Sequence, residues 1–153
     1  MATEWTILAL LRAEVEGRIQ ALTPHGHKDK PFRPLSDEHR QSGVERHLSP
    51  RSFVAGRPER VTSDSPEEFG TSNREPSFHV PIRIVYPTFP ENWRDAALSD
   101  AGQIRQDIDN NAATMPSGVQ QRFILGEPVF EAVADDPWET MTLTLFARLN
   151  AEG

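Results

Sequence analysis

The chain contains no cysteine among its 153 residues, and this absence excludes several kinds of chemistry. Disulfides, thiolate zinc sites and cysteine nucleophiles all require that residue. A cysteine-free chain is typical of a protein that assembles in a reducing cytoplasm. We therefore look for function in surfaces and in polar side chains.

Long hydrophobic runs are also missing. No segment approaches the roughly 20 apolar residues that a membrane helix needs. The apolar run near the N-terminus is interrupted by Arg12 and Glu14, and Glu4 stands where a signal peptide would carry basic residues. We expect neither a signal peptide nor a membrane span, and a length of 153 residues fits one domain with its own core.

The chain has fewer basic than acidic residues, and its formal net charge is -7. Residues 24–76 hold nine of the 16 Lys/Arg and nine of the 23 Asp/Glu, so the remainder carries seven against fourteen. This acidic remainder argues against binding nucleic acid through counterion release. It suits a surface that DNA passes without being retained.

The first regular segment is EWTILALLRAEVEGRIQAL, residues 4–22. Thr3 can cap its start, and Pro24 and Gly26 follow its end. The pattern predicts an amphipathic helix of about five turns. Its apolar face would comprise Leu8, Leu11, Val15, Ile19 and Leu22.

Residues 24–76 have the composition of an arm or a loop region. They hold seven of the 13 prolines and four of the five histidines. The segment RSFVAGRPERVTS, residues 51–63, predicts a ragged strand or hairpin arm that Gly56 and Pro58 interrupt. We expect a single α+β domain over residues 1–153 in which 24–76 is a Pro/His/Arg-rich arm or loop insertion, either disordered on its own or ordered against a partner.

The most strongly patterned segment is FHVPIRIVYP, residues 78–87, which predicts a strand with one buried face. Pro81 stands in its middle and has no N–H to donate to a neighbouring strand. We therefore expect an edge strand, a bulge, or a place where the free side of the strand meets something other than an ordinary neighbouring strand. The buried face would carry Phe78, Val80, Ile82, Ile84 and Tyr86.

The remaining segments complete the fold. Residues 95–115 predict a second amphipathic helix, with Ser99 or Asp100 as candidate caps. Residues 121–133 and 139–150 predict two strands joined by a turn at DDPW. The order predicts an α+β fold, an antiparallel or mixed β-sheet packed by two helices on one face.

Catalytic and metal-binding patterns are weak. His25 and His27 could share an ion only if His39, His47 or Asp29 completed the ligand set, and a solvated loop is the favoured interpretation. Ser77, His79 and the acids Asp135 and Asp136 could be drawn as a triad, but no nucleophile elbow accompanies them. The paired acids Glu67 and Glu68, or Asp107 and Asp109, do not converge on one helix face. We expect no enzymatic activity, cofactor or metal.

Arginine is concentrated between residues 33 and 60, where six arginines stand against four acids. Protein contact is favoured over nucleic acid, because no aromatic residues are interleaved for stacking and the rest of the chain is acidic. Contact between identical subunits would pair a basic arm with an acidic body. The six are Arg33, Arg40, Arg46, Arg51, Arg57 and Arg60.

The layout resembles the tail terminator proteins of long-tailed bacteriophages and of related gene transfer particles. The resemblance rests on the N-terminal helix, the arm-like middle, the strand FHVPIRIVYP, the helix AGQIRQDIDNNA and the closing hairpin FILGEPVFEAVADDPWETMTLTLFARL. The chain departs from that layout in its long Pro- and His-rich middle.

The resemblance implies a structural virion protein that forms a hexameric ring on the head-proximal end of the tail tube. Such a ring ends tube polymerisation and docks the tail to the head-completion or stopper protein of the neck. Its partners would be copies of itself, the major tail tube protein and the stopper, with DNA only as cargo in the lumen and no membrane. The protein would be assembled in the bacterial host cytoplasm and would reside at the tail-neck junction of the virion.

Within such a ring, an arm from the next subunit would cover the strand that carries Pro81. The residues expected at this interface are Arg51, Phe53, Arg57, Arg60, His79 and Pro81. Two alternatives stay open: a head-completion or stopper protein of the head-tail connector, and a small intracellular enzyme or ligand-binding domain of ferredoxin-like fold.

Overall fold

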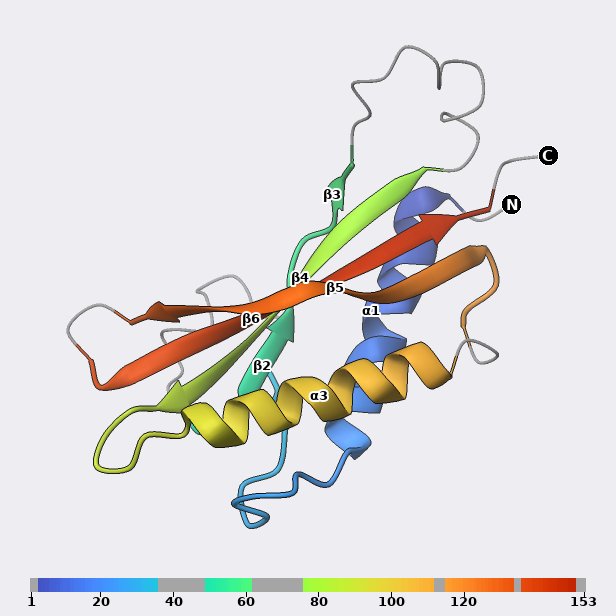
Figure 1. Cartoon of the computed structure of the whole chain (residues 1–153). Helices are drawn as coiled ribbons and strands as arrows, with labels where there is room; N and C mark the ends of the chain where they lie inside the picture. Colours follow the sequence, from blue (N-terminus) through green and yellow to red (C-terminus); the bar gives the residue numbers. More distant parts are fainter. Residues whose placement is uncertain (1–2, 36–48, 62–75, 112–114, 134–135, 151–153) are drawn as a thin grey trace.

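In the computed structural model, two helices pack against one mixed sheet (Figure 1). The structure describes residues 3–35, 49–61, 76–111, 115–133 and 136–150. The α+β prediction is thereby confirmed. In chain order the elements are α1 (Glu4–Ala21), β1 (Arg33–Pro34), β2 (Ser52–Ala55), β3 (Glu59–Arg60), β4 (Ser77–Pro87), α3 (Arg94–Asn110), β5 (Val119–Ala132) and β6 (Trp138–Leu149).

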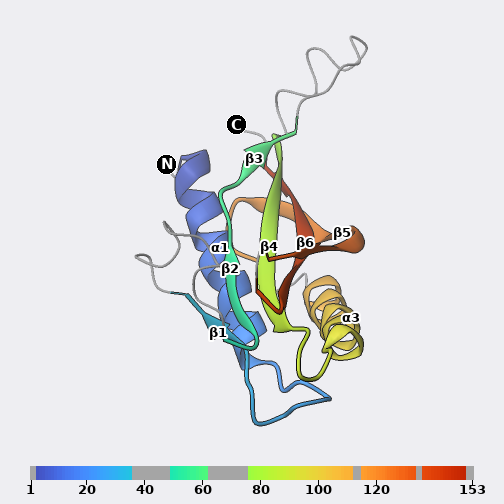
Figure 2. The ribbon, with the colours of Figure 1, turned by 90° about the vertical axis from the view of Figure 1, so that its left-hand side faces the viewer.

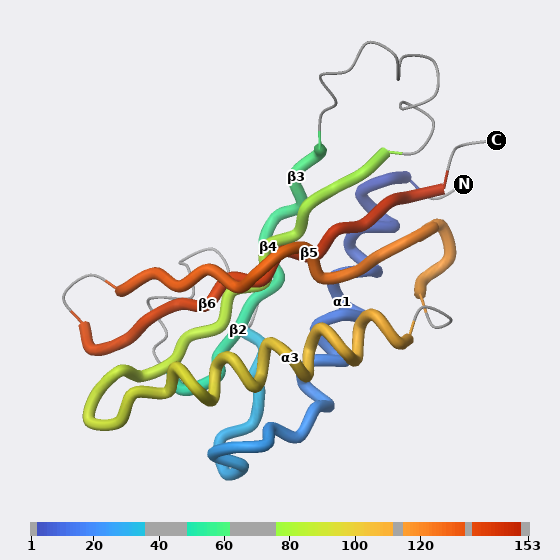
Figure 3. The backbone as a smooth tube through the Cα atoms, in the orientation of Figure 1, coloured from blue at the N-terminus to red at the C-terminus, as the bar shows by residue number. Residues whose placement is uncertain are grey.

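The strands run across the sheet in the order β1-β2-β4-β6-β5, and β3 pairs with β4 beyond the end of β2 (Figure 2). β1 and β2 are parallel, whereas the other pairs are antiparallel. The long strands β4, β5 and β6 twist strongly along their length (Figure 3). Such twist is the ordinary consequence of backbone chirality.

Helix α1 follows the sequence pattern closely. The hydroxyl oxygen of Thr3 accepts a hydrogen bond from the backbone N–H of Thr6 at 3.2 Å, which satisfies one of the free donors of the first turn. Leu8, Leu11 and Val15 are buried, as the apolar spacing predicts. The predicted helix and its cap are both confirmed.

The two helices cover the same face of the sheet. The even-numbered residues of β4 face them, and alternate residues of β6 from Met141 to Leu149 join the same core, because paired residues on neighbouring strands share a face. Ile104 of α3 and Leu11 of α1 pack into this core. The opposite face carries a small separate cluster of buried residues, made of Leu35, Val54 and Val85 with the partly buried Trp138.

Strand β4 is central, so the expectation that FHVPIRIVYP lies at an edge is wrong. It pairs with β6 over its whole length on one side and with β2 and β3 on the other. The carbonyl of Pro81 accepts a hydrogen bond from the N–H of Gly56 at 2.7 Å. Since N–H and C=O of one residue point to the same side of a strand, the nitrogen of Pro81 faces the gap between β2 and β3. No ladder donor is needed there, which explains how a proline fits a central strand.

The described parts of residues 24–76 belong to the body of the domain. β1, β2 and β3 join the sheet, and Phe32 and Phe53 lie in the main core. The arm prediction is therefore wrong for residues 24–35 and 49–61, where sheet pairing outweighs the polar composition. Residues 36–48 and 62–75 lie outside the described residues.

Helix α3 begins earlier than its sequence suggested. Its N-cap position is Trp93, which makes no side-chain cap hydrogen bond. The side-chain oxygen Oδ1 of Asn92 accepts a hydrogen bond from the backbone N–H of Arg94 instead. The candidate caps Ser99 and Asp100 lie inside the helix. Within the described residues, neither helix is long and apolar enough to cross a membrane.

Candidate assembly interface

Two of the predicted interface residues lie inside the subunit. The side chains of Arg51 and Phe53 are completely buried, so neither can contact another subunit in this fold. Phe53 packs edge-on against Phe32 in the core. The interface prediction is wrong for these two residues, because an arginine whose donors are all satisfied internally behaves as a core residue.

Arg51 uses all five guanidinium donors within the chain. Its Nε donates to Asp100 Oδ2 at 2.6 Å and its Nη2 donates to Asp100 Oδ1 at 3.0 Å, which is a two-pronged ion pair. The remaining donors reach the backbone carbonyls of Gly26, His27 and Lys30 at 2.8–3.0 Å. The network ties the 26–30 loop, β2 and α3 together.

Tyr86 completes this buried network. Its hydroxyl donates to Asp100 Oδ2 at 2.8 Å. Burial, followed by the negative charge of Asp100, raises the pKa of Tyr86 well above its ordinary value. Trp93 lies on the far side of Arg51, whose guanidinium carbon is 5.3 Å from the centroid of its indole ring. The network holds distant segments of the chain together, and its ionisable groups Arg51, Tyr86 and Asp100 are all buried.

Arg57 and Arg60 are exposed, in keeping with their expected place on a surface. Arg60 pairs with Glu4 and lies over the ring of Phe78, with 5.0 Å between the guanidinium carbon and the ring centroid. No partner for Arg57 is found among the described residues. An interface that uses Arg57 or Arg60 stays a prediction.

His79 and Pro81 lie on the face of the sheet that the helices leave uncovered. His79 stands opposite Glu59 of β3 and Phe146 of β6, and its ring centroid is 6.1 Å from that of Phe146. Pro81 stands opposite Thr144. Both are half-buried. The expectation that an arm of the next subunit covers this strand loses its basis, because β6 pairs with β4 on one side and β2 and β3 pair with it on the other. Contact of His79 or Pro81 with a partner through the uncovered face stays a prediction.

The residues drawn as a catalytic triad are not brought together. Ser77 and His79 are two positions apart on one strand, and Asp136 precedes the end of β6 that pairs with Pro87. Along β6 that end lies roughly 26 Å from the partner of His79, at about 3.3 Å per residue. Asp135 lies outside the described residues.

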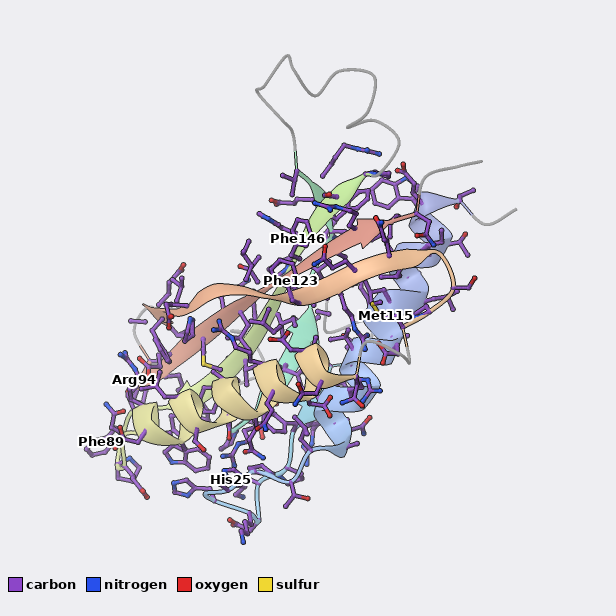
Figure 4. The ribbon with its side chains drawn as sticks, turned by 45° about the vertical axis from the view of Figure 1, so that its right-hand side comes forward. His25, Phe89, Arg94, Met115, Phe123 and Phe146 are labelled. Atoms are coloured by element: carbon purple, nitrogen blue, oxygen red, sulfur yellow. The ribbon has the colours of Figure 1, made fainter. Side chains whose placement is uncertain are left out.

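The histidines near the end of α1 serve packing. His27 stacks on Trp93 with ring centroids 3.7 Å apart, and its Nε2 is 3.3 Å from Glu91. His25 is exposed on the same loop (Figure 4). Among the residues that the structure describes, no group of three or more His, Asp or Glu side chains is placed to hold a metal ion.

One edge of the sheet is covered by side chains of α1. The N–H of Ala55 donates to Glu16 Oε2 at 3.0 Å. The C=O of Ala55 accepts from Arg12, with an Nη2 distance of 2.7 Å. β1 pairs with β2 only at Ser52 and Phe53, so Ala55 lies at the edge of the sheet. Since free backbone groups at an edge invite pairing with another chain, these two side chains reduce that hazard at Ala55.

The opposite edge is covered in the same manner by α3. Asp109 accepts from the N–H of Ile124 at 3.4 Å, and Arg105 donates to the C=O of Gly126. In both helices an arginine is followed four residues later by an acid, a spacing that places the two on one helix face. Indiscriminate strand addition is thus opposed at Ala55 of β2 and at Ile124 and Gly126 of β5.

The exposed face of α1 carries no charge. All five charged residues of the helix are half-buried or buried, and each contacts another part of the chain: Glu4 with Arg60, Arg12 and Glu16 with Ala55, Glu14 with Arg18 and Arg122, and Arg18 with Asp107. Trp5 is 59% exposed and Leu10 is 55% exposed. We call the exposed positions the outer α1 face: Trp5, Thr6, Ala9, Leu10, Ala13, Gly17, Gln20 and Ala21.

A second surface, largely apolar, lies on the helix-free side of the sheet, and the guanidinium carbon of Arg148 lies 5.6 Å from the centroid of the Phe146 ring at its margin. Phe123 and Phe146 stack there with ring centroids 4.9 Å apart (Figure 4). Pro81, Thr144 and Leu125 form the next row across β4, β6 and β5, and Leu125 is 39% exposed. We call this surface the open sheet patch: His79, Pro81, Phe123, Leu125, Thr144 and Phe146.

Sequence reasoning missed both surfaces for identifiable reasons. In the sequence of α1, the apolar spacing of the buried face dominates the pattern, so the outer α1 face was not predicted. Its sign in the sequence is the four-residue spacing of the small residues Ala9, Ala13 and Gly17. The open sheet patch depends on which strands are neighbours, and that pairing is long-range. Only the alternation of Thr144 and Phe146 with buried residues pointed toward it.

Comparison of the sequence with models of known protein families finds no match, and comparison with curated proteins finds no significant match.

Proposed function

We propose that this protein is a structural subunit that assembles with copies of itself into a ring. The ring would cap the head-proximal end of the tail tube of a bacteriophage or gene transfer particle, end its polymerisation and dock it to the neck. The observation that carries the proposal is the uncharged outer α1 face, on which Trp5 and Leu10 are more than half exposed. Surface helices of monomers ordinarily present charged residues to water. An exposed apolar patch whose charged neighbours are engaged elsewhere favours an interaction site.

The layout of the chain supports tail termination as the setting for that assembly. The order of helix, short strands, long strand, helix and closing hairpin is the order on which the resemblance to tail terminators rests. Such proteins act through binding and geometry. The charged groups of the described core, above all Arg51 and Asp100, are engaged with each other and with the backbone, which agrees with a structural role.

Electrostatics supports a lumen through which DNA passes as cargo. The net charge is -7, and many arginines are already engaged within the chain. The excess of acids over bases disfavours the retention of phosphates. Arginines that donate to a carboxylate or a carbonyl within the chain are Arg12, Arg18, Arg51, Arg60, Arg94, Arg105 and Arg122.

Deletion of the gene from its source particle, followed by measurement of tail lengths in negative-stain electron micrographs, tests the proposal. We expect overlong tubes beside filled heads that lack tails, because nothing would stop tube growth. Tails of normal length detached from heads would place the protein on the head side of the joint instead. Unaltered particles would contradict the proposal.

A further inference from the structure

We infer that the outer α1 face of one subunit packs across the open sheet patch of the next subunit, in a head-to-tail contact between two copies of this chain. This inference rests on the proposed assembly into a ring, and it adds the two surfaces that meet and the direction in which the ring is built.

The outer α1 face is built for close packing on an apolar partner. Ala9, Ala13, Gly17 and Ala21 recur every four residues and so form a narrow row of small side chains. Small residues let a helix backbone come close to its partner, and Leu10 stands beside the row as an apolar anchor. The charged residues of α1 are engaged elsewhere, so no ion would have to be desolvated when this face is covered.

The open sheet patch is the matching surface. Phe123, Phe146 and Leu125 give it apolar area, and Thr144 lies at its centre on a strand that is paired on both sides. A sheet whose second face carries apolar side chains is ordinarily covered by another layer. Within the described residues that face is covered only near Val85, at the other end of β4.

The dimensions of the two surfaces agree. α1 has 18 residues and is about 27 Å long, at 1.5 Å per residue. β6 has 12 residues and is about 40 Å long, at 3.3 Å per residue. The part of β6 beyond Thr140, the partner of Val85, runs to Leu149 and is about 30 Å long at 3.3 Å per residue, so it matches the length of the helix.

The two surfaces lie on opposite sides of the subunit, because α1 covers one face of the sheet and the patch lies on the other. A contact between unlike surfaces on opposite sides repeats from copy to copy. It closes into a ring when the rotation per subunit divides a full turn. This geometry matches the proposed function, whereas a two-fold contact between two α1 helices would stop at a dimer and leave the sheet patch uncovered.

Nucleic acid fits the patch less well. Phe123 and Phe146 would offer stacking surfaces, and the guanidinium carbon of Arg148 lies 5.6 Å from the centroid of the Phe146 ring, but the acidic charge around them disfavours phosphates. Glu59 stands directly opposite His79, and the net charge of the chain is -7. The outer α1 face carries no negative charge and so is not repelled by these acids.

Two single substitutions test the contact, each placing an ammonium on one surface only. Ala13→Lys lies in the middle of the outer α1 face, and Thr144→Lys lies in the middle of the open sheet patch. Gln106→Lys, exposed on α3, is the matched control. The mass of the full-length protein is measured by sedimentation velocity for the wild type, for each variant and for an equimolar mixture of the two variants. Circular dichroism confirms that each variant is folded.

We expect a multimer for the wild type and for Gln106→Lys, and monomers of 17.2 kDa for each interface variant. The association of each variant should be weaker by about 100-fold or more, because an unpaired charge would be buried at the contact. The mixture should form a one-to-one dimer, since the intact α1 face of Thr144→Lys can still meet the intact patch of Ala13→Lys. Only a contact between two unlike surfaces predicts that dimer.

Three results would overturn the inference. A monomeric wild type would mean that no second copy covers either surface. A multimer that neither variant disturbs would place the contact elsewhere while leaving the ring proposal standing. Loss of assembly in Ala13→Lys alone would indicate a symmetric contact between two α1 helices. Tail lengths in the gene deletion judge the proposed function separately from all three.

Discussion

Replacement of Arg51 by methionine should strongly destabilise the fold, because it breaks a fully buried ion pair. The Asp100 carboxylate would keep only the Tyr86 hydroxyl, and three backbone carbonyls of residues 26–30 would lose their donors. Breaking a buried pair by removing one partner costs about 3–5 kcal/mol. Each deprived carbonyl adds about 1 kcal/mol or more unless the loop turns it to water, so we expect a loss of about 5 kcal/mol.

The assay is equilibrium unfolding in urea followed by tryptophan fluorescence, which Trp93 makes sensitive to the network because its ring lies beside Arg51. Arg51→Lys keeps the charge but not the planar fork, so it should lose about 2 kcal/mol. The exposed Arg57→Met is the matched control and should change stability by less than about 0.5 kcal/mol.

A double-mutant cycle then separates the ion pair from the rest of the network. Arg51→Met combined with Asp100→Leu should lose less stability than the sum of the two single variants, by about 1–3 kcal/mol. Stability of Arg51→Met within about 1 kcal/mol of the wild type would refute the reasoning, because it would mean that the buried pair contributes no more than a surface one.

Three further predictions follow from single side chains. Tyr86 is the only tyrosine, and its raised pKa means that the folded protein keeps a proton that the unfolded chain releases near pH 10; stability is therefore full below pH 10 and falls above it, and tyrosinate absorbance should appear only as the protein unfolds. Gly56→Ala should destabilise by about 1 kcal/mol, since its Cβ would lie 3.0 Å from Cγ of Pro81, and Pro81→Ala in the same chain should recover part of the loss in urea unfolding. Gly102→Ala, in the middle of α3 with nothing within 4 Å of its Cβ, should raise stability by about 0.5–1 kcal/mol in the same assay. Tyrosinate absorbance that rises at pH 10 while the far-UV dichroism stays native, or equal effects of the two glycine substitutions, would contradict these assignments.

The local elements could be predicted from the sequence because their signals are local. The spacing of apolar residues in 4–22, with Thr3 before it, predicted α1 and its cap. The alternation in 139–150 predicted β6 and its buried face, and Gly126 and Pro128 marked the irregularity that appears as a register shift in β5. These patterns are sufficient because side-chain periodicity is a direct consequence of helix and strand geometry.

Long-range partners could not be predicted in the same way. The sequence predicts Arg51 at a subunit interface because arginines are mostly exposed, and no local pattern indicates that Asp100, 49 residues away, meets it in the core. Pro81 indicated an edge because a central strand usually needs every donor, and the gap between β2 and β3 that removes this need appears only once the sheet is assembled. Both errors follow from pairing between segments that are distant in sequence.

The central claim, that this protein forms the ring that ends the tail tube, is tested most directly by tail length in particles whose only copy of the protein carries Ala13→Lys or Thr144→Lys. Tail lengths are measured in negative-stain micrographs beside the wild type, the Gln106→Lys control and the gene deletion. We expect overlong tubes for both interface variants, as in the deletion, and tails of normal length for the control. Normal tail lengths in the deletion itself would contradict it.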